Sequence, residues 1–136
     1  MNSIDFSIHD LKCGNTLNYQ TSEGEILPTV IYWQDLKWLT EDPKGFNLVH
    51  SPIPLTEDWL LKFGFERKDS STCVQWWNGI NEITHDWLVD LIWLKEPERI
   101  GAPNFPFYRN GKHTIYYVHQ LQNLYFALTG EELCVK

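Results

Sequence analysis

Residues 107–128, FYRNGKHTIYYVHQLQNLYFAL, join a tight hairpin to an amphipathic helix. Asn110-Gly111 tolerates the positive φ angles of a type I′ turn, so it predicts strands over 107–109 and 114–118. Apolar side chains then recur at the spacing of one helix face, and a glycine follows: Leu121, Leu124, Tyr125, Leu128 and Gly130. This pattern predicts a short helix over 120–128 that packs on an antiparallel sheet.

The segments upstream of this hairpin predict the rest of the sheet. Residues 65–68 and 72–77 flank the turn residues Asp69-Ser70-Ser71 and predict a hairpin, after which Asn78-Gly79 predicts a turn. Residues 83–94 alternate with polar positions at first and are rich in Val, Ile and Trp, so we interpret them as a long central strand. Residues 95–106 contain three prolines and one glycine, which predicts a loop.

The N-terminal part of the chain predicts short strands joined by turns. Three apolar segments are separated by two groups of turn residues: 6–11, 17–19 and 26–33, with Gly14-Asn15 and Ser22-Glu23-Gly24 between them. This order predicts a curled meander or part of a small barrel. Pro28 places the start of the third strand at an edge or a bulge. Residues 34–50 have a mixed pattern, and we interpret them as a connector.

Residues 51–64 contain the clearest helix start. Thr56 is a good N-cap, Glu57 and Asp58 lie in the first turn, and Gly64 is a natural C-cap, so this helix should run for only two turns. The chain therefore predicts an α+β fold with an N-terminal meander of short strands, an antiparallel sheet and two short helices. Its length of 136 residues fits a single domain over 1–136.

The composition excludes several classes of protein. Hydrophobic residues make up 43% of the chain, which is enough for a core and argues against intrinsic disorder. With 11 basic and 18 acidic residues, the net charge of −7 argues against non-specific nucleic-acid binding. Three separated cysteines without a CxxC pair are typical of a reducing compartment. Because neither a signal peptide nor a membrane span is visible, we expect a cytoplasmic protein without a membrane partner.

No sequence motif assigns an enzymatic activity. The chain has no phosphate-binding loop and no nucleophile elbow, and its histidines show no metal-binding spacing: His9, His50, His85, His113 and His119. His85-Asp86 with Asp90 could supply a general acid and base, but neighbouring residues of a strand face opposite sides. We therefore assign no catalytic residue, no metal ion and no cofactor, and we rank a small hydrolase-like enzyme third among the possible functions.

Seven tryptophans are unusual in a chain of this length. Five of them lie on apolar stripes and are predicted to be core residues: Trp33, Trp38, Trp59, Trp87 and Trp93. Trp76 and Trp77 are neighbours on a predicted strand, so one of them must point away from whatever the other packs against. We expect that outward side chain to be covered by a loop or helix, to lie in an interface, or to stack on a ligand.

Polar and aromatic side chains around the C-terminal hairpin and helix form the predicted ligand site. A planar or phosphate-bearing ligand would meet aromatic rings, a guanidinium group and the free amides of a helix N-terminus there. The residues of this predicted site are Trp76, Trp77, Tyr108, Arg109, His113, Tyr116, His119, Gln122 and Asn123. The alternative is that His119 or Gln120 caps the helix while Gln122 and Asn123 face water.

Two long segments carry a family resemblance: PIPLTEDWLLKFGF at 52–65 and YVHQLQNLYFALTGEEL at 117–133. They resemble a group of small uncharacterised proteins encoded by Bacteroidetes-lineage bacteria and their phages or prophages, and DLKCGN at 10–15 resembles the usual start of that group. The resemblance implies a phage or mobile-element accessory protein that acts in the bacterial cytoplasm. Such proteins often bind a component of the host, including the nucleotide signals of anti-phage defence.

The function we expect from the sequence is therefore non-enzymatic binding, with a small nucleotide-like host signal held in an aromatic-lined pocket. The alternative is a protein–protein interaction module that forms a homo-oligomer or inhibits a host protein, because an excess of Trp and Tyr is typical of interfaces.

Overall fold

The computed structural model describes residues 5–69, 73–80, 87–94, 108–110, 113–133 and 135. For Cys73, His113 and the ranges 77–80, 87–94 and 108–110 it describes the backbone alone. The chain divides into two compact units: unit 1 is Met1–Pro54 with Tyr117–Leu124, and unit 2 is Leu55–Tyr116 with Tyr125–Lys136. This division does not test independent folding, so the single-domain assignment stays a prediction. Helices and antiparallel strands occur together, which confirms the α+β class.

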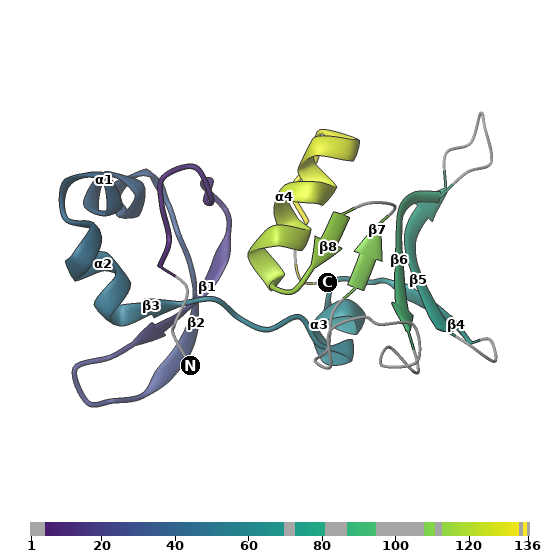
Figure 1. Ribbon diagram of the computed structural model, residues 1–136, viewed down its shortest axis with the longest axis horizontal. Coiled ribbons are helices and arrows are strands. Elements are labelled where there is room, and N and C mark those ends of the chain that lie inside the picture. Colours follow the sequence, from purple (N-terminus) through teal and green to yellow (C-terminus); the bar gives the residue numbers. More distant parts are fainter. Residues whose placement is uncertain are drawn as a thin grey trace. The chain divides into compact units, whose positions relative to one another are not determined.

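Unit 1 contains a three-stranded antiparallel sheet in the order β2-β1-β3 (Figure 1). Its strands are β1 Thr16–Gln20, β2 Ile26–Val30 and β3 His50–Ser51. Strand β2 is an edge strand, which confirms the position predicted from Pro28. The described strands form an open sheet and do not close into a barrel. Strands β1 and β2 form a hairpin, but β3 pairs with β1 and not with β2, so the order is not that of a meander.

The segment 6–11 is not a strand, contrary to the prediction. The Asp10 carboxylate accepts hydrogen bonds from the Ser7 N–H at 2.9 Å and from the Ser7 hydroxyl at 3.2 Å, and the Asp10 N–H donates to the Ser7 carbonyl at 3.0 Å. These bonds close residues 8–10 into a turn. Phe6 and Leu11 are still buried on either side of it.

The predicted connector 34–50 is wrong, because the segment forms two helices, α1 Trp33–Glu41 and α2 Pro43–Val49. The Asp35 carboxylate accepts from the Tyr32 N–H at 2.8 Å and caps α1. Asp42 ends α1 and starts α2, because its carboxylate accepts from the Gly45 N–H at 3.2 Å. The residues that suggested a loop are therefore the cap between two helices.

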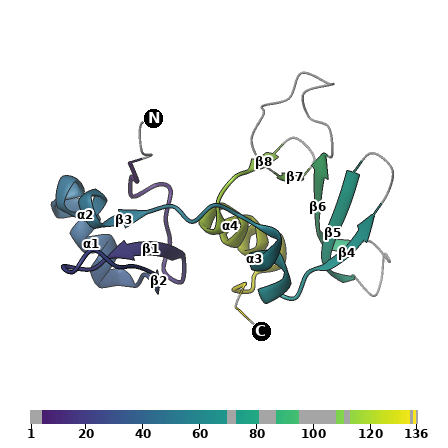
Figure 2. The same cartoon turned by 90° about the horizontal axis from the view of Figure 1, so that it is seen from below.

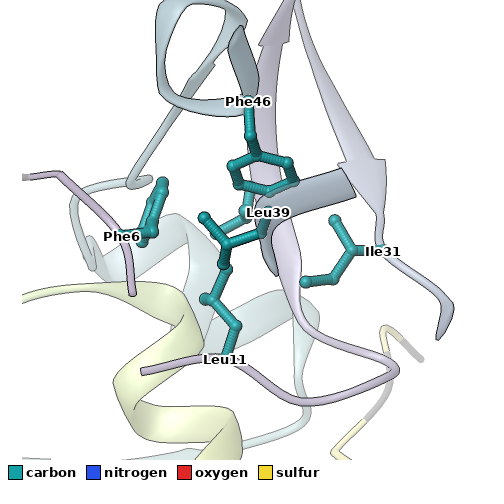
Figure 3. Close-up of a cluster of buried hydrophobic side chains, with 6 residues drawn as sticks. Phe6, Leu11, Ile31, Leu39 and Phe46 are labelled. Carbon is teal, nitrogen blue, oxygen red and sulfur yellow. The ribbon is translucent and has the colours of Figure 1, made fainter. Parts of the chain in front are cut away.

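The two helices pack on one face of the sheet and enclose the core of unit 1 (Figure 1). Figure 3 shows the labelled side chains converging from the N-terminal segment, the end of β2, α1 and α2. The cluster consists of Phe6, Leu11, Leu17, Ile31, Leu39 and Phe46, none more than 7% exposed. Leu17 of β1 faces the helices, so the alternate positions along the hairpin face the opposite side of the sheet.

Unit 2 contains a five-stranded antiparallel sheet in the order β4-β5-β6-β7-β8. The strands are β4 Glu66–Asp69, β5 Cys73–Ile80, β6 Trp87–Leu94, β7 Tyr108–Asn110 and β8 His113–Ile115. Figure 2 shows β4, β5 and β6 side by side. The strand pairing of both predicted hairpins and the central position of β6 are confirmed. The bounds of the second hairpin differ from the prediction, because Asn110 belongs to β7 and pairs with His113, and β8 ends at Ile115 instead of residue 118.

Two details of unit 2 differ from the predictions or lie beyond them. The turn predicted at Asn78-Gly79 is wrong, because β5 continues to Ile80 and pairs Asn78 with Val89 of β6. The loop predicted over 95–106 lies outside the described residues, as do His85 and Asp86.

Both predicted helices are present. Helix α3, Glu57–Lys62, begins after Thr56, whose hydroxyl accepts from the Trp59 N–H at 3.4 Å. Helix α4, Val118–Thr129, starts two residues before the predicted position and ends before Gly130, which has a positive φ of 75°. Its first seven residues belong to unit 1 and its last five to unit 2.

Candidate functional site

Gln122, from the predicted ligand site, is buried on α4 with 2% of its surface exposed. Its Oε1 accepts from the Thr16 N–H at 2.7 Å. Its Nε2 donates to the Thr16 hydroxyl at 3.2 Å and to the Gly14 carbonyl at 3.4 Å. Both amide hydrogens are therefore used within the protein, and the side chain anchors α4 to the start of β1.

Asn123 lies beside it and is tied to the same N-terminal segment. Its Oδ1 accepts from Asn15 Nδ2 at 2.9 Å, and its Nδ2 donates to the Asp10 carbonyl at 3.0 Å. Asn15 is fully buried and also accepts from the Lys12 N–H at 2.8 Å. The two amides join residues 10–16 to α4. The alternative that Gln122 faces water is therefore wrong, whereas ligand binding by these amides stays a prediction.

His119 is the third predicted site residue in unit 1, and it is 5% exposed. Its ring stacks on Tyr117 at a centroid distance of 5.8 Å and meets Phe6 edge-on at 5.4 Å. Burial lowers the pKa of His119 to about 4, with a small opposing effect from Asp10. The imidazole is therefore neutral at pH 7, and its Nδ1 has no hydrogen-bond partner among the described residues.

The other six predicted site residues belong to unit 2. Trp76 is 2% exposed, so it is the inward member of the tryptophan pair. The Arg67 guanidinium lies 5.8 Å from its ring centroid and is paired with Glu57 and Asp69. Tyr116 is partly buried. The side chains of the remaining four residues lie outside the described part of the chain: Trp77, Tyr108, Arg109 and His113.

A pocket of about 320 Å³ opens beside α2 and is lined by Asp5, Lys44, Asn47 and Leu48. The Asn47 amide is already occupied, because its Oδ1 accepts from the Phe6 N–H at 2.6 Å and its Nδ2 donates to the Phe6 and Pro43 carbonyls. The lining thus offers a ligand one carboxylate and one ammonium group. Nothing in the lining selects a class of ligand.

Metal binding finds no support in the described ranges, where no three His, Cys, Asp or Glu side chains form a group that could hold an ion. His50 is stacked on Phe46 at 3.9 Å, and its Nδ1 lies 2.9 Å from the Phe46 carbonyl. Burial lowers the pKa of His50 as well. Both buried histidines of unit 1 thus serve as aromatic packing residues.

The exposed apolar surface of unit 1 is the feature that the sequence prediction missed. Four exposed apolar side chains lie on the outer face of β2 or follow it at the start of α1, and we call them the β2–α1 strip: Ile26 (61%), Val30 (42%), Tyr32 (58%) and Trp33 (63%). Leu27 is also exposed (48%), but it pairs with Tyr19 and therefore lies on the same face of the hairpin as Leu17. Trp33 was predicted to be a core residue, but it is the first residue of α1, where Leu36 and Leu39 take the positions that face the core. An exposed tryptophan at a helix start is uncommon, because Trp is highly buried on average.

The backbone of β2 has one free edge. Ile31 donates to the Asn15 carbonyl and accepts from the Gly14 N–H, both at 2.9 Å, and the Thr21 N–H donates to the Glu25 carbonyl at 2.8 Å. Odd-numbered residues therefore bond toward β1, and even-numbered residues direct their backbone groups to the free edge. Pro28 is one of the even-numbered residues and has no N–H, so it interrupts that edge.

No helix in the described ranges is long and apolar enough to cross a membrane. No protein-family model, curated protein or solved structure matches the chain significantly.

Proposed function

We propose that this chain is a non-enzymatic protein-interaction module that binds another protein through the β2–α1 strip. The observation that carries the proposal is the exposure of Tyr32 and Trp33 next to the apolar side chains of β2. Tyr and Trp are enriched at protein interfaces, and grouped exposed apolar residues mark interaction sites. A role as a phage-type accessory protein, which the sequence resemblance implies, is compatible with such a contact.

The size of the strip suits the centre of an interface. With their exposed fractions, the four side chains present roughly 350 Å² of surface. A standard protein–protein interface covers roughly 800 Å² on each partner, with an apolar centre and a polar rim. The strip accounts for the apolar centre, and Trp33 is the side chain most suited to be its anchor.

The free edge of β2 favours side-chain packing over addition of a partner strand. A strand that joined this edge would find N–H donors only at Ile26 and Val30, because Pro28 has none. Pro28 thus protects an exposed edge from indiscriminate strand pairing while leaving the side chains of the strip available.

The small-ligand alternative has weaker support. Its residues in unit 1 are the amides of Gln122 and Asn123, which hydrogen-bond to the chain itself, and His119, which is buried and neutral. A ligand would have to displace bonds that hold α4 to β1.

Site-specific photo-crosslinking in the cells that naturally encode the protein tests the proposal. A benzophenone side chain replaces Trp33 in one variant and Leu61 in the control, because Leu61 is an exposed apolar residue of unit 2. We expect a discrete protein adduct from position 33 and none from position 61. An adduct of twice the mass of the chain would identify the partner as a second copy. Absence of an adduct at 33, or the same adducts from both positions, would refute the proposal.

A further inference from the structure

We infer that the segment that docks on the β2–α1 strip is basic, with apolar side chains that meet the strip and Lys or Arg residues beside them. This inference rests on the proposed protein-interaction function and adds the chemistry of the partner. It follows from the charges of the residues that precede and follow the strip in the chain.

The ionised side chains of residues 13–36 are all acidic. Between Lys12 and Lys37 there is no Lys, Arg or His, whereas Glu23, Glu25 and Asp35 all lie there. The Asp35 carboxylate is occupied, because it caps α1 through the Tyr32 N–H. Lys37 lies one helical turn after Trp33, and its ammonium group is 3.9 Å from the Glu41 carboxylate, so this pair adds no net charge beside the strip.

Glu23 and Glu25 remain as the available carboxylates. Both are exposed, and neither has an ion-pair partner among the described residues. Their turn is well defined, because the Gly24 N–H donates to the Thr21 carbonyl at 2.9 Å and the Glu25 N–H donates to the Thr21 hydroxyl at 3.2 Å. Glu25 directly precedes Ile26, and its side chain starts from the opposite face of the hairpin, so its carboxylate lies at the rim of the strip and not over its apolar centre.

The positions of the acidic residues and of the strip along β2 define the order of charged and apolar side chains that a partner segment must have. A strand advances about 3.3 Å per residue, so Glu25 and Val30 are separated by roughly 16 Å along β2. The complementary segment would place a cation at one end of an apolar stretch of about that length. Opposite charges at the rim of an interface accelerate association and fix its orientation more than they add to affinity.

Charge also argues against a second copy as the occupant. Each chain has a net charge of −7, so two copies would bring Glu23 and Glu25 toward another acidic surface. An acidic partner would meet the same repulsion.

A library of random peptides of roughly twelve residues, long enough to span the strip in extended form, provides the probe. Peptides are selected on the full-length protein and counter-selected on the strip variant Ile26→Thr/Trp33→Ser, whose folding is verified by circular dichroism. We expect the strip-dependent peptides to be enriched in Lys and Arg as well as in apolar residues. Strip-dependent peptides that are neutral or acidic would overturn the inference and leave the proposed function intact. Absence of strip-dependent peptides would count against both.

Charge reversal with a matched control separates local from overall attraction. Glu23→Lys/Glu25→Lys is compared with Glu66→Lys/Glu131→Lys, which changes the net charge equally at two exposed positions of unit 2. For the best cationic peptide we expect about a tenfold weaker affinity with the first pair and a much smaller change with the second. Equal losses for the two pairs, or no loss for either, would overturn the inference.

Discussion

Acidification should destabilise unit 1 through His119. The pKa of His119 is about 4 in the folded protein, against 6.5 for an unburied imidazole. Between these two values the unfolded chain binds more protons than the folded one, so the free energy of unfolding falls as the pH falls. The contribution of the neutral His119 side chain to the free energy of unfolding is fully present above pH 6.5 and is lost progressively toward pH 4. Linkage gives a loss of about 2 kcal/mol between pH 8 and pH 5, and about 3 kcal/mol in total.

The structure explains why burial dominates this shift. The ring lies between Phe6 and Tyr117, and no described side chain or carbonyl accepts a hydrogen bond from Nδ1. A protonated imidazole there would lose its hydration without a compensating hydrogen bond. The pKa of His50 is also lowered by burial, so His50 adds to the loss in the same direction.

Urea unfolding at constant ionic strength, followed by circular dichroism from pH 8 to pH 5, measures this dependence. In the variant His119→Phe, an aromatic ring stays between Phe6 and Tyr117 but no longer titrates. We expect its loss of stability over this range to be smaller than that of the parent by about 2 kcal/mol. An NMR titration of His119 in the parent should give a pKa well below 6.5. An unchanged pH dependence in the variant, or a His119 pKa near 6.5, would refute the reasoning.

Two further predictions concern the contacts that hold the elements in place. Gln122→Leu removes the hydrogen bonds to Thr16 and Gly14 and leaves partly buried backbone groups without these partners, so it should lower the free energy of unfolding by about 1–3 kcal/mol. A loss below about 0.5 kcal/mol in urea unfolding would contradict the anchoring role. Thr56→Ala removes the N-cap of α3 and should cost about 1 kcal/mol, whereas Thr56→Ser should cost little because it keeps the accepting hydroxyl. Equal losses for these two substitutions would show that the cap does not stabilise the protein.

Local sequence patterns predicted those elements of the fold that are decided by neighbouring residues. The hairpin around 110–111, the cap at Thr56 and the helix before Gly130 each depend on residues a few positions apart. Helices α1 and α2 escaped prediction because Asp42, Pro43 and Gly45 have the composition of a loop. The same residues form a cap when a helix precedes and another follows. Composition alone does not distinguish the two cases.

The candidate site was harder to predict because its contacts are long-range. Gln122 and Thr16 are joined by a hydrogen bond although they are 106 residues apart in the sequence. A polar side chain in the first turns of a helix has the same sequence environment whether it meets water, a ligand or a distant backbone group. Trp33 was mispredicted in the opposite direction. Its apolar neighbours in the sequence predicted a buried side chain, but Trp33 is the first residue of α1 and its side chain is exposed.

Stability and binding should be separable in unit 1, because they depend on different residues. The core cluster is formed by side chains of the N-terminal segment, of the core-facing side of the hairpin and of the two helices, and none of the strip residues belongs to it. Exposed side chains contribute little to the free energy of unfolding. Ile26→Thr/Trp33→Ser should therefore leave the urea midpoint nearly unchanged while it abolishes binding of the partner that the crosslinking identifies or of the selected peptides. A loss of stability comparable to that of Gln122→Leu would mean that the strip serves the fold instead of a partner.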